Sequence, residues 1–182
     1  MFQENNITIY TDGSSRGNPG RGGFASIISF ANHKVIELGG KDIYTTNNKM
    51  ELSGVIEGLR ISLSHVTHDM RHIKVYSDSK YVLNGITVWI KNWKKNNWKT
   101  AAKKAVLNQE LWQELDTLVE AVSYKKMTIE WNYVKGHADN PYNNRADIIA
   151  TTCADLDENE LADKKTKIFF EGDFDTWIKN VA

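Results

Sequence analysis

Two aspartates stand at equivalent places in two similar stretches of this sequence. Asp12 follows Ile-Thr-Ile-Tyr-Thr at residues 7–11, and Asp78 follows Ile-Lys-Val-Tyr-Ser at residues 73–77. Alternation with period two predicts β-strands, so each carboxylate is expected where a strand ends. If the two strands lie side by side in the same direction, the carboxylates meet at the rim of one sheet. Two carboxylates this close share a proton or bind a cation, so the sequence predicts a metal site there.

Three further polar residues could belong to the same site. Glu51 falls in the first turn of a helix expected over residues 50–63, at the edge of its apolar stripe. Asp147 lies near the start of a helix expected over residues 144–155, and His137 lies in the Gly/Pro loop before it. Each has a plain explanation, since a first-turn acid complements the helix dipole and a loop histidine is commonly surface polar. Together with the two aspartates, they favour one shared site.

A basic segment follows the second aspartate strand. It combines three tryptophans with six lysines and no acid over residues 89–104: Trp89, Trp93 and Trp98 with Lys91, Lys94, Lys95, Lys99, Lys103 and Lys104. Aromatic faces and cations suit a sugar-phosphate strand, through stacking and phosphate contacts. The alternative is an amphipathic helix that buries Trp89 and Trp93 beneath solvated lysines. Both interpretations remain open from the sequence.

Composition limits the class of protein. The 182-residue chain is 41% hydrophobic, with six Trp, seven Tyr and six Phe, as expected of one domain with an apolar core. No apolar run approaches the roughly 20 residues of a membrane helix, and residues 1–6 do not resemble a signal peptide. Cys153 is the single cysteine, which excludes an internal disulfide and a thiolate zinc site. We therefore expect a cytoplasmic protein.

The rest of the pattern indicates an α/β protein. Strands are expected over residues 7–11, 24–30, 35–38, 73–77 and 127–134, with a long helix over 107–122. The glycine-dense stretch at residues 13–23 is either a hairpin connector or a place where backbone amides approach a phosphate or sugar. The end of the chain, from Asp157, is acidic and then aromatic. It could pack back on the domain or dock a partner.

Six short motifs, in order along the chain, carry a family resemblance. They are TDGS at 11–14, GNPG at 17–20, TTNNKMEL at 45–52, SDS at 77–79, VKGHA at 134–138 and NRAD at 144–147. In these motifs the chain resembles type 1 ribonuclease H of the bacterial kind, over roughly residues 7–154. Residues 85–100 resemble the basic protrusion of that family.

The resemblance implies a fold and an activity. The expected fold is a five-stranded mixed sheet, an antiparallel meander plus parallel strands, flanked by helices. Residues 1–155 would form the catalytic domain, with a basic protrusion at about 86–104, and residues 156–182 a C-terminal extension of unknown role. The expected activity is hydrolysis of the RNA strand of RNA–DNA hybrids, leaving 5′-phosphate and 3′-hydroxyl ends. The protein is expected to be a monomer that does not bind a membrane.

The resemblance also assigns roles to residues. Asp12, Glu51, Asp78 and Asp147 would bind two Mg²⁺ ions, with Mn²⁺ as a possible substitute, and His137 would assist proton transfer or product release. Carboxylates suit these hard cations, which in pairs support phosphodiester hydrolysis. Substrate contacts are expected from three groups: Ser15, Asn18, Asn47 and Asn48 in the minor groove; Thr46 and Lys49 on a phosphate; and Trp89, Trp93, Lys94, Lys95 and Lys99 along the DNA strand.

Four positions depart from the commonest family pattern. Ser15 replaces a frequent cysteine, Lys80 replaces a glutamine and adds charge near the metals, and Asp139 and Asn140 replace Gly-His. Two other functions are compatible with parts of the pattern: a hybrid-binding module with weak catalysis, and another metal-dependent nuclease on the same fold. The first has no need for four acids facing a polyanion, and the basic segment argues against the second.

Overall fold

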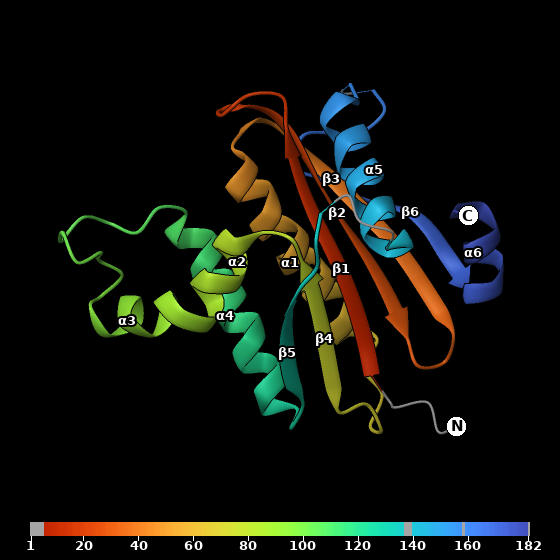
Figure 1. Cartoon of the computed structure of the whole chain (residues 1–182), viewed down its shortest axis with the longest axis horizontal. Helices are drawn as coiled ribbons and strands as arrows, with labels where there is room; N and C mark the ends of the chain where they lie inside the picture. Colours follow the sequence, from red (N-terminus) through yellow and green to blue (C-terminus); the bar gives the residue numbers. More distant parts are fainter. Residues whose placement is uncertain (1–5, 137–139, 158, 182) are drawn as a thin grey trace.

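A computed structural model describes residues 6–136, 140–157 and 159–181, which form one mixed sheet with helices on both faces (Figure 1). The elements, in chain order, are β1 (Asn6–Ser15), β2 (Gly20–Phe30), β3 (Lys34–Thr45), α1 (Asn47–Ser64), β4 (His72–Ser77), α2 (Lys80–Asn84), the π-helical turn η1 (Gly85–Trp89), α3 (Ile90–Lys95), α4 (Gln109–Tyr124), β5 (Thr128–Tyr133), α5 (Pro141–Asp155), β6 (Thr166–Asp173) and α6 (Phe174–Val181).

The sheet has the strand order β5-β4-β1-β2-β3-β6. Strands β1, β2 and β3 form the predicted antiparallel meander, and β4 and β5 run parallel to β1. In the β1–β4 pair, Thr11 lies opposite Ser77. The side-by-side arrangement predicted for the two aspartate strands is therefore confirmed.

The mixed α/β fold is confirmed, but the expected number of five strands is wrong. The sixth strand, β6, comes from the C-terminal extension and pairs antiparallel with β3. Its alternation is short, so its strand signal in the sequence is weak. The meander leaves one edge of β3 with open backbone groups, and pairing with β6 satisfies them. The extension thus packs back on the sheet.

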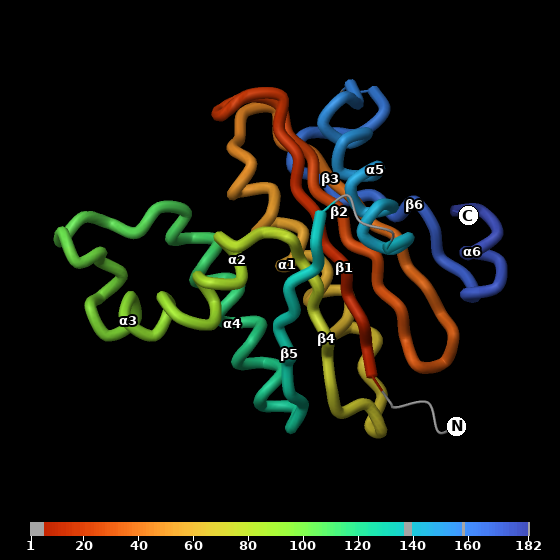
Figure 2. Tube along the Cα trace, viewed as in Figure 1, coloured from red at the N-terminus to blue at the C-terminus, as the bar shows by residue number. Residues whose placement is uncertain are grey.

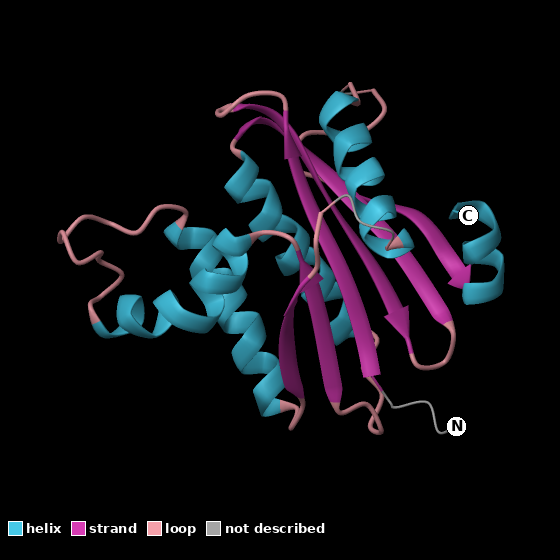
Figure 3. Ribbon diagram, in the orientation of Figure 1, coloured by secondary structure: helices cyan, strands magenta, loops and turns pink. Residues whose placement is uncertain are grey.

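Helices lie on both faces of the sheet (Figure 3), and each face has its own apolar core. One core packs α1, α2 and α4 against the sheet, with Leu52, Val55, Leu59, Trp112 and Leu115 among its buried residues. The other core packs α5 and α6 against the opposite face. Most of the large apolar side chains in this second core come from the extension, because α5 itself contributes small residues such as Ala146 and Ala150.

Most of the glycine-dense stretch lies in strands and not in a loop, because β1 continues to Ser15 and β2 begins at Gly20. A side chain at Gly23 would place its Cβ 2.2 Å from the Ala150 carbonyl oxygen and 2.5 Å from the Ala154 nitrogen. Gly23 is therefore required for α5 to lie close to the sheet. Helix packing was not among the two explanations that the sequence suggested for these glycines.

The helix starts follow their capping residues. Thr46 caps α1 and accepts a hydrogen bond from the Lys49 N–H, and Ser79 caps α2 in the same way through the Val82 N–H. Figure 2 shows α3 and the loop toward α4 extending away from the sheet, at the left of the view. Within the described residues, no helix is both long and apolar enough to cross a membrane.

Candidate metal centre and nucleic-acid surface

The candidate metal centre lies where β4 ends beside β1: Asp78 directly follows β4, and Asp12 lies within β1, three residues before its end. The register that sets Thr11 beside Ser77 brings the following residues, Asp12 and Asp78, together at one rim of the sheet. Asp12 is buried, with 7% of its surface exposed, whereas Asp78 is half-buried. The Gly13 N–H donates to Asp12 Oδ1 at 2.8 Å, which fixes the direction of this carboxylate.

Glu51 reaches the same rim from the first turns of α1. A side chain at Gly13 would place its Cβ 2.3 Å from the Glu51 nitrogen, so the backbone of α1 rests directly on Gly13. The Glu51 side chain is 5% exposed, and the Asn47 amide donates to its Oε1 at 3.4 Å. The absence of a side chain at position 13 is what allows the helix to bring Glu51 to Asp12.

Three acids thus converge, and a fourth lies beside them. One carboxylate oxygen from each of Asp12, Glu51 and Asp78 lies within 4.8 Å of the other two. Asp147, in the second turn of α5, lies close enough to Asp12 for the two carboxyl groups to interact. Thr151 Oγ1 donates to Asp147 Oδ1 at 3.5 Å. The four acids that the sequence singled out are therefore neighbours.

Burial and neighbouring carboxylates disfavour the ionisation of Asp12 and Glu51. Burial raises the pKa of Asp12 to about 8, and the nearby Asp78 and Asp147 carboxylates contribute to this rise. Burial also raises the pKa of Glu51 well above its usual value, with further contributions from Asp12 and Asp78. Negative charge at this rim is costly without a compensating cation.

A divalent cation fits this donor set. Glu51 Oε2 is buried and has no hydrogen-bond partner among the described residues, although a buried carboxylate oxygen normally has one. Carboxylate oxygens are the ligands preferred by Mg²⁺ and Mn²⁺. The unpartnered oxygen and the crowded carboxylates both favour a bound cation over a set of structural hydrogen bonds.

The loop between β5 and α5 borders the centre. At Gly136, a Cβ would lie 2.4 Å from Asp78 Oδ2, so this backbone lies against the second aspartate. His137 and Asp139, both singled out in the sequence, lie outside the described residues. Asn140 caps α5, its Oδ1 accepting from the Asn143 N–H at 3.1 Å. The Asn140 departure from the family pattern thus has a structural role.

The residues expected in the minor groove gather on one surface beside the centre. The turn after β1 meets the start of α1, where the Asn47 N–H donates to Asn18 Oδ1 at 3.4 Å. Ser15 is half-buried at the end of β1, and Asn48 is exposed in the first turn of α1. These small polar side chains are available to a shallow groove, and Asn47 also contacts Glu51.

The two residues expected to bind a phosphate lie near this surface. The Thr46 side chain caps α1 by accepting from the Lys49 N–H at 3.4 Å. Lys49 is half-buried and lines a pocket of about 370 Å³ bordered by β3, α1 and α4. Thr46 therefore has a structural role whether or not it contacts substrate.

The tryptophans of the basic segment form a ring cluster on α4. The ring centroids of Trp93 and Trp112 lie 5.3 Å apart, those of Trp89 and Trp93 5.8 Å, and those of Trp93 and Trp98 6.5 Å. Trp112 is fully buried, and Trp89 keeps 37% of its surface exposed. The cluster attaches the protrusion to the domain, as the amphipathic interpretation requires, while Trp89 keeps an exposed edge.

The lysines of this segment differ from one another. Lys94 Nζ lies 2.6 Å from Asp116 Oδ2 and 2.8 Å from Glu120 Oε1, both on α4. Lys95 and Lys99 are exposed, and neither forms an ion pair with a described residue. Lys80 is also exposed and lies 5.9 Å from the centre of the Tyr133 ring. Lys95 and Lys99 are thus the freer cations for a phosphate.

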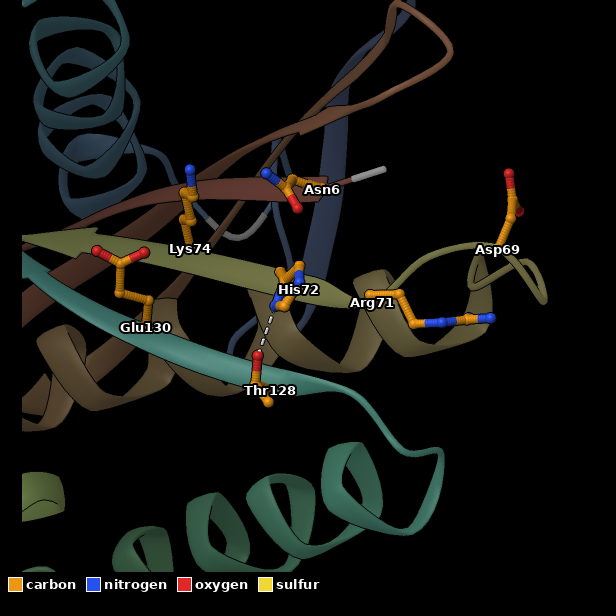
Figure 4. A pocket seen from close by; sticks show the side chains of 7 residues that line it. All are labelled: Asn6, Asp69, Arg71, His72, Lys74, Thr128 and Glu130. Carbon is orange, nitrogen blue, oxygen red and sulfur yellow. Dashed lines mark hydrogen bonds between the residues drawn. The ribbon is translucent and has the colours of Figure 1, made fainter. Parts of the chain in front are cut away.

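A pocket of about 560 Å³ lies where β1, β4 and β5 begin, at the end of these strands opposite to Asp78; Figure 4 shows the side chains that line it. Its lining has mixed charge: Asn6, Asp69, Arg71, His72, Lys74, Thr128 and Glu130. His72 Nδ1 and Thr128 Oγ1 are 2.7 Å apart, which closes one side of the lining. The site chemistry belongs to the rim and not to this pocket.

Several residues around the centre were missed in the sequence. Tyr76, Tyr10, Tyr142 and Trp177 form a continuous stack of rings, and Glu37, Arg145 and Trp177 form a hydrogen-bonded group. One signal was visible, because a tyrosine stands two residues before each rim aspartate. The partners on α5 and α6 carry no such local signal.

Comparisons with known proteins point to one family. A sequence profile described as RNase H matches residues 4–155. The chain is 49% identical to a Ribonuclease H of Thermosynechococcus vestitus over 142 residues, covering 78% of this chain and 84% of the relative. It is 45% identical to a Ribonuclease H of Francisella philomiragia over 148 residues, covering 81% of this chain and 90% of the relative.

Solved structures agree on the fold. LC9-RNase H1, described as a type 1 RNase H with the type 2 active-site motif, superposes with a TM-score of 0.72 at 27% identity, covering 97% of this chain and 82% of that one. This match therefore includes part of the C-terminal extension. LC11-RNase H1, solved in complex with an RNA/DNA hybrid, superposes with a TM-score of 0.60 at 22% identity, covering 82% of this chain and 96% of that one.

Proposed function

The chain belongs to the RNase H family, as a type 1 enzyme of the bacterial kind, and on that premise we propose which of its residues carry the activity. The enzyme hydrolyses the RNA strand of RNA–DNA hybrids and depends on metal ions. The competing prediction of another nuclease on the same fold is thereby set aside. Asp12, Glu51, Asp78 and Asp147 are proposed as the metal ligands, and Mg²⁺ as the metal, with Mn²⁺ able to substitute.

One observation supports this assignment above the others: the convergence of Asp12, Glu51 and Asp78 with an unpartnered buried oxygen on Glu51. A module that only binds a polyanion would gain nothing from acids that repel it. Acids that stay costly without a cation are instead suited to bind one. When bound, divalent cations supply an activated water and stabilise the departing oxygen of the cleaved phosphodiester.

The protein's own residues give this chemistry its orientation. The Gly13 N–H sets the direction of the Asp12 carboxylate, which would hold a cation together with the other three acids. Asn47 donates to Glu51 and leaves its Oε2 for a cation. Glu51 is also proposed to sense the RNA 2′-hydroxyl, the group that separates RNA from DNA. His137 stays a prediction for proton transfer or product release.

The substrate surface is proposed to run from the turn between β1 and β2 to the protrusion. Ser15, Asn18, Asn47 and Asn48 would face the minor groove of the hybrid, with Thr46 and Lys49 at a DNA phosphate. Trp89, Lys95 and Lys99 would follow the DNA strand. Trp93 and Lys94 serve the protrusion itself through Trp112, Asp116 and Glu120, so their contribution to binding is proposed to be indirect. The monomeric state and the cytoplasmic location stay predictions.

A substrate panel tests the activity. Labelled RNA–DNA hybrid, duplex RNA, duplex DNA and single-stranded RNA are each incubated with Mg²⁺ or with EDTA. We expect cleavage of the RNA strand of the hybrid alone, and only with Mg²⁺. Cleavage of duplex DNA, or hybrid cleavage that survives EDTA, would contradict the proposal.

A pair of substitutions on one helix tests the ligand assignment. Glu51→Gln keeps the shape of the side chain and removes its charge, so we expect loss of Mg²⁺-dependent cleavage and weaker Mn²⁺ binding by calorimetry. Glu57→Gln is the matched control, since Glu57 lies on the same helix but forms an ion pair with Arg60 and does not belong to the acidic cluster. Equal losses in the two variants would refute a specific role for Glu51.

A further inference from the structure

Glu37 is a buried acid that the metal centre does not use. It lies on β3, is 1% exposed, and accepts three hydrogen bonds. Arg145 Nε donates to Oε1 at 2.7 Å, Arg145 Nη2 donates to Oε2 at 2.8 Å, and the Trp177 indole N–H donates to Oε1 at 2.7 Å. A buried carboxylate is stable only when such partners are present. Glu37 therefore ties α5 and α6 to one point on the sheet.

Arg145 lies two residues before Asp147 on the same helix. With 3.6 residues per turn, two residues correspond to a rotation of roughly 200°, so the two side chains leave α5 on nearly opposite sides. Arg145 points toward β3, where it meets Glu37, and Asp147 points toward Asp12 on β1. Any rotation of α5 about its axis would move both. The Arg145–Glu37 pair thus sets the direction in which Asp147 projects.

A row of stacked rings joins the same elements. The ring centroids of Trp177 and Tyr142 are 4.7 Å apart, those of Tyr142 and Tyr10 4.9 Å, and those of Tyr10 and Tyr76 4.7 Å. Tyr142 lies in the first turn of α5. Residues two apart on a strand face the same side, so Tyr10 faces the same side of β1 as Asp12. Trp177 ends this row at the extension.

Strand β6 and the start of α6 attach the extension to β3 and to the turn before it. Strand β6 pairs with β3, Lys34 Nζ lies 2.6 Å from Glu171 Oε1, and the Phe174 N–H donates to the His33 carbonyl at 2.7 Å. Trp177 is fully buried. A side chain without exposed surface does not serve to dock another protein. Its contacts are instead made with α5 and Glu37.

We propose that the C-terminal extension positions Asp147 in the metal centre, through the hydrogen bonds that Trp177 and Arg145 both make to Glu37. Trp177 is a positioning residue that orients Glu37, and Glu37 fixes the rotation of α5. The inference rests on the proposed role of Asp147 as a metal ligand. It gives the extension, which lies outside the matched family profile at residues 4–155, a part in the reaction.

Trp177→Phe is the most direct test, because phenylalanine keeps an aromatic ring and removes the N–H donor. We expect Mn²⁺ binding by calorimetry to weaken about three- to tenfold, a smaller effect than the loss of a direct partner of a ligand. The Mg²⁺ concentration for half-maximal cleavage should rise by the same factor. The KM for hybrid should stay unchanged, since the substitution does not alter the substrate surface on α1 and on the turn between β1 and β2.

Glu37→Gln provides a second variant, since its amide cannot accept the paired donors of Arg145. If both residues act through one path, the double variant should bind Mn²⁺ no more weakly than the weaker single variant. Glu171→Gln is the matched control: it removes an ion pair between β3 and β6 that does not contact α5. We expect it to leave Mn²⁺ binding unchanged.

The outcomes separate this inference from the proposed function. If Asp147→Asn keeps wild-type Mn²⁺ binding and cleavage, the assignment of Asp147 fails, and the positioning role with it. If Asp147→Asn abolishes metal-dependent cleavage while Trp177→Phe and Glu37→Gln bind Mn²⁺ as the wild type does, only the positioning role is overturned. A lower melting temperature with unchanged Mn²⁺ affinity in the folded variants would likewise overturn it.

Discussion

The acidic rim and the basic protrusion are both rich in charge, but they differ in how their polar groups are satisfied. At the rim, buried carboxylates crowd together and Glu51 Oε2 lacks a partner among the described residues. In the protrusion, Lys94 is paired with two acids and the tryptophans pack on Trp112. Buried polar groups without a partner indicate a site that binds a further component, such as a cation. Polar groups whose hydrogen bonds or ion pairs are complete indicate a structural role.

Asp12→Asn should break the rim most severely. Asparagine keeps the Oδ1 that accepts from Gly13 but loses the charge that a cation requires. Metal catalysis contributes several kcal/mol, so we expect cleavage to fall by about 10³-fold or more. Hybrid binding, measured by fluorescence anisotropy, should persist. Retained cleavage would show that Asp12 is not a ligand.

Gly13→Ala should disturb the rim through the backbone. Its Cβ would meet the Glu51 nitrogen at 2.3 Å, so α1 must move away from β1. Overpacking of this kind costs about 1–3 kcal/mol or more, and we expect both denaturant stability and Mn²⁺ affinity to fall. Gly172→Ala on β6 is the control, because the three atoms nearest to its Cβ all belong to the Phe170 side chain and none to α1. Unchanged Mn²⁺ affinity in Gly13→Ala would argue against this packing requirement.

The stability of the metal-free enzyme should fall as pH rises from about 5 to 8. The pKa of Asp12 is about 8 in the folded protein, against an ordinary value of 3.8. Between these two values the folded state binds a proton that the unfolded state does not, so the folded state loses stability as the pH rises. The pKa of Glu51 is raised in the same direction. A tenfold change in the proton affinity of one group corresponds to about 1.4 kcal/mol, so the loss should be measurable.

Urea melts at pH 5 and pH 8 measure this dependence, with and without Mg²⁺. Saturating Mg²⁺ should restore stability at pH 8, because the cation replaces the protons. In the metal-free state, the stability advantage of Asp12→Asn over the wild type should be larger at pH 8 than at pH 5. A metal-free wild type that gains stability from pH 5 to pH 8 would refute this electrostatic description.

The smallest effects distinguish the lysines of the protrusion. Lys94→Ala removes partly exposed ion pairs and should lower stability by about 0.5 kcal/mol. Lys95→Ala and Lys99→Ala should instead raise the KM for hybrid and reduce the salt slope of binding by about one charge each. Stability and salt titrations on all three variants test the division. A flatter slope for Lys94→Ala alone would reverse the assignment.

Local patterns explain which parts of the fold could be predicted. The β1 and β4 strands follow from alternation, and the starts of α1 and α2 from Thr46 and Ser79. The likeness of the two stretches suggested that Asp12 and Asp78 meet, and the parallel pairing of β1 with β4 confirms it. Strand β6 was missed because its pairing depends on the open edge of β3 and not on its own residues.

For the site, the sequence by itself determined which acids are present and that two of them stand at equivalent places in two similar stretches. Its motifs also determined the family, since those residue types recur in a fixed order. Only the tertiary structure decided three contacts: the backbone of Glu51 packs against Gly13, Lys94 forms an ion pair with Asp116, and the Trp177 indole N–H donates to Glu37. These contacts join residues far apart in the chain, and their energy comes from packing and burial, which no local spacing encodes.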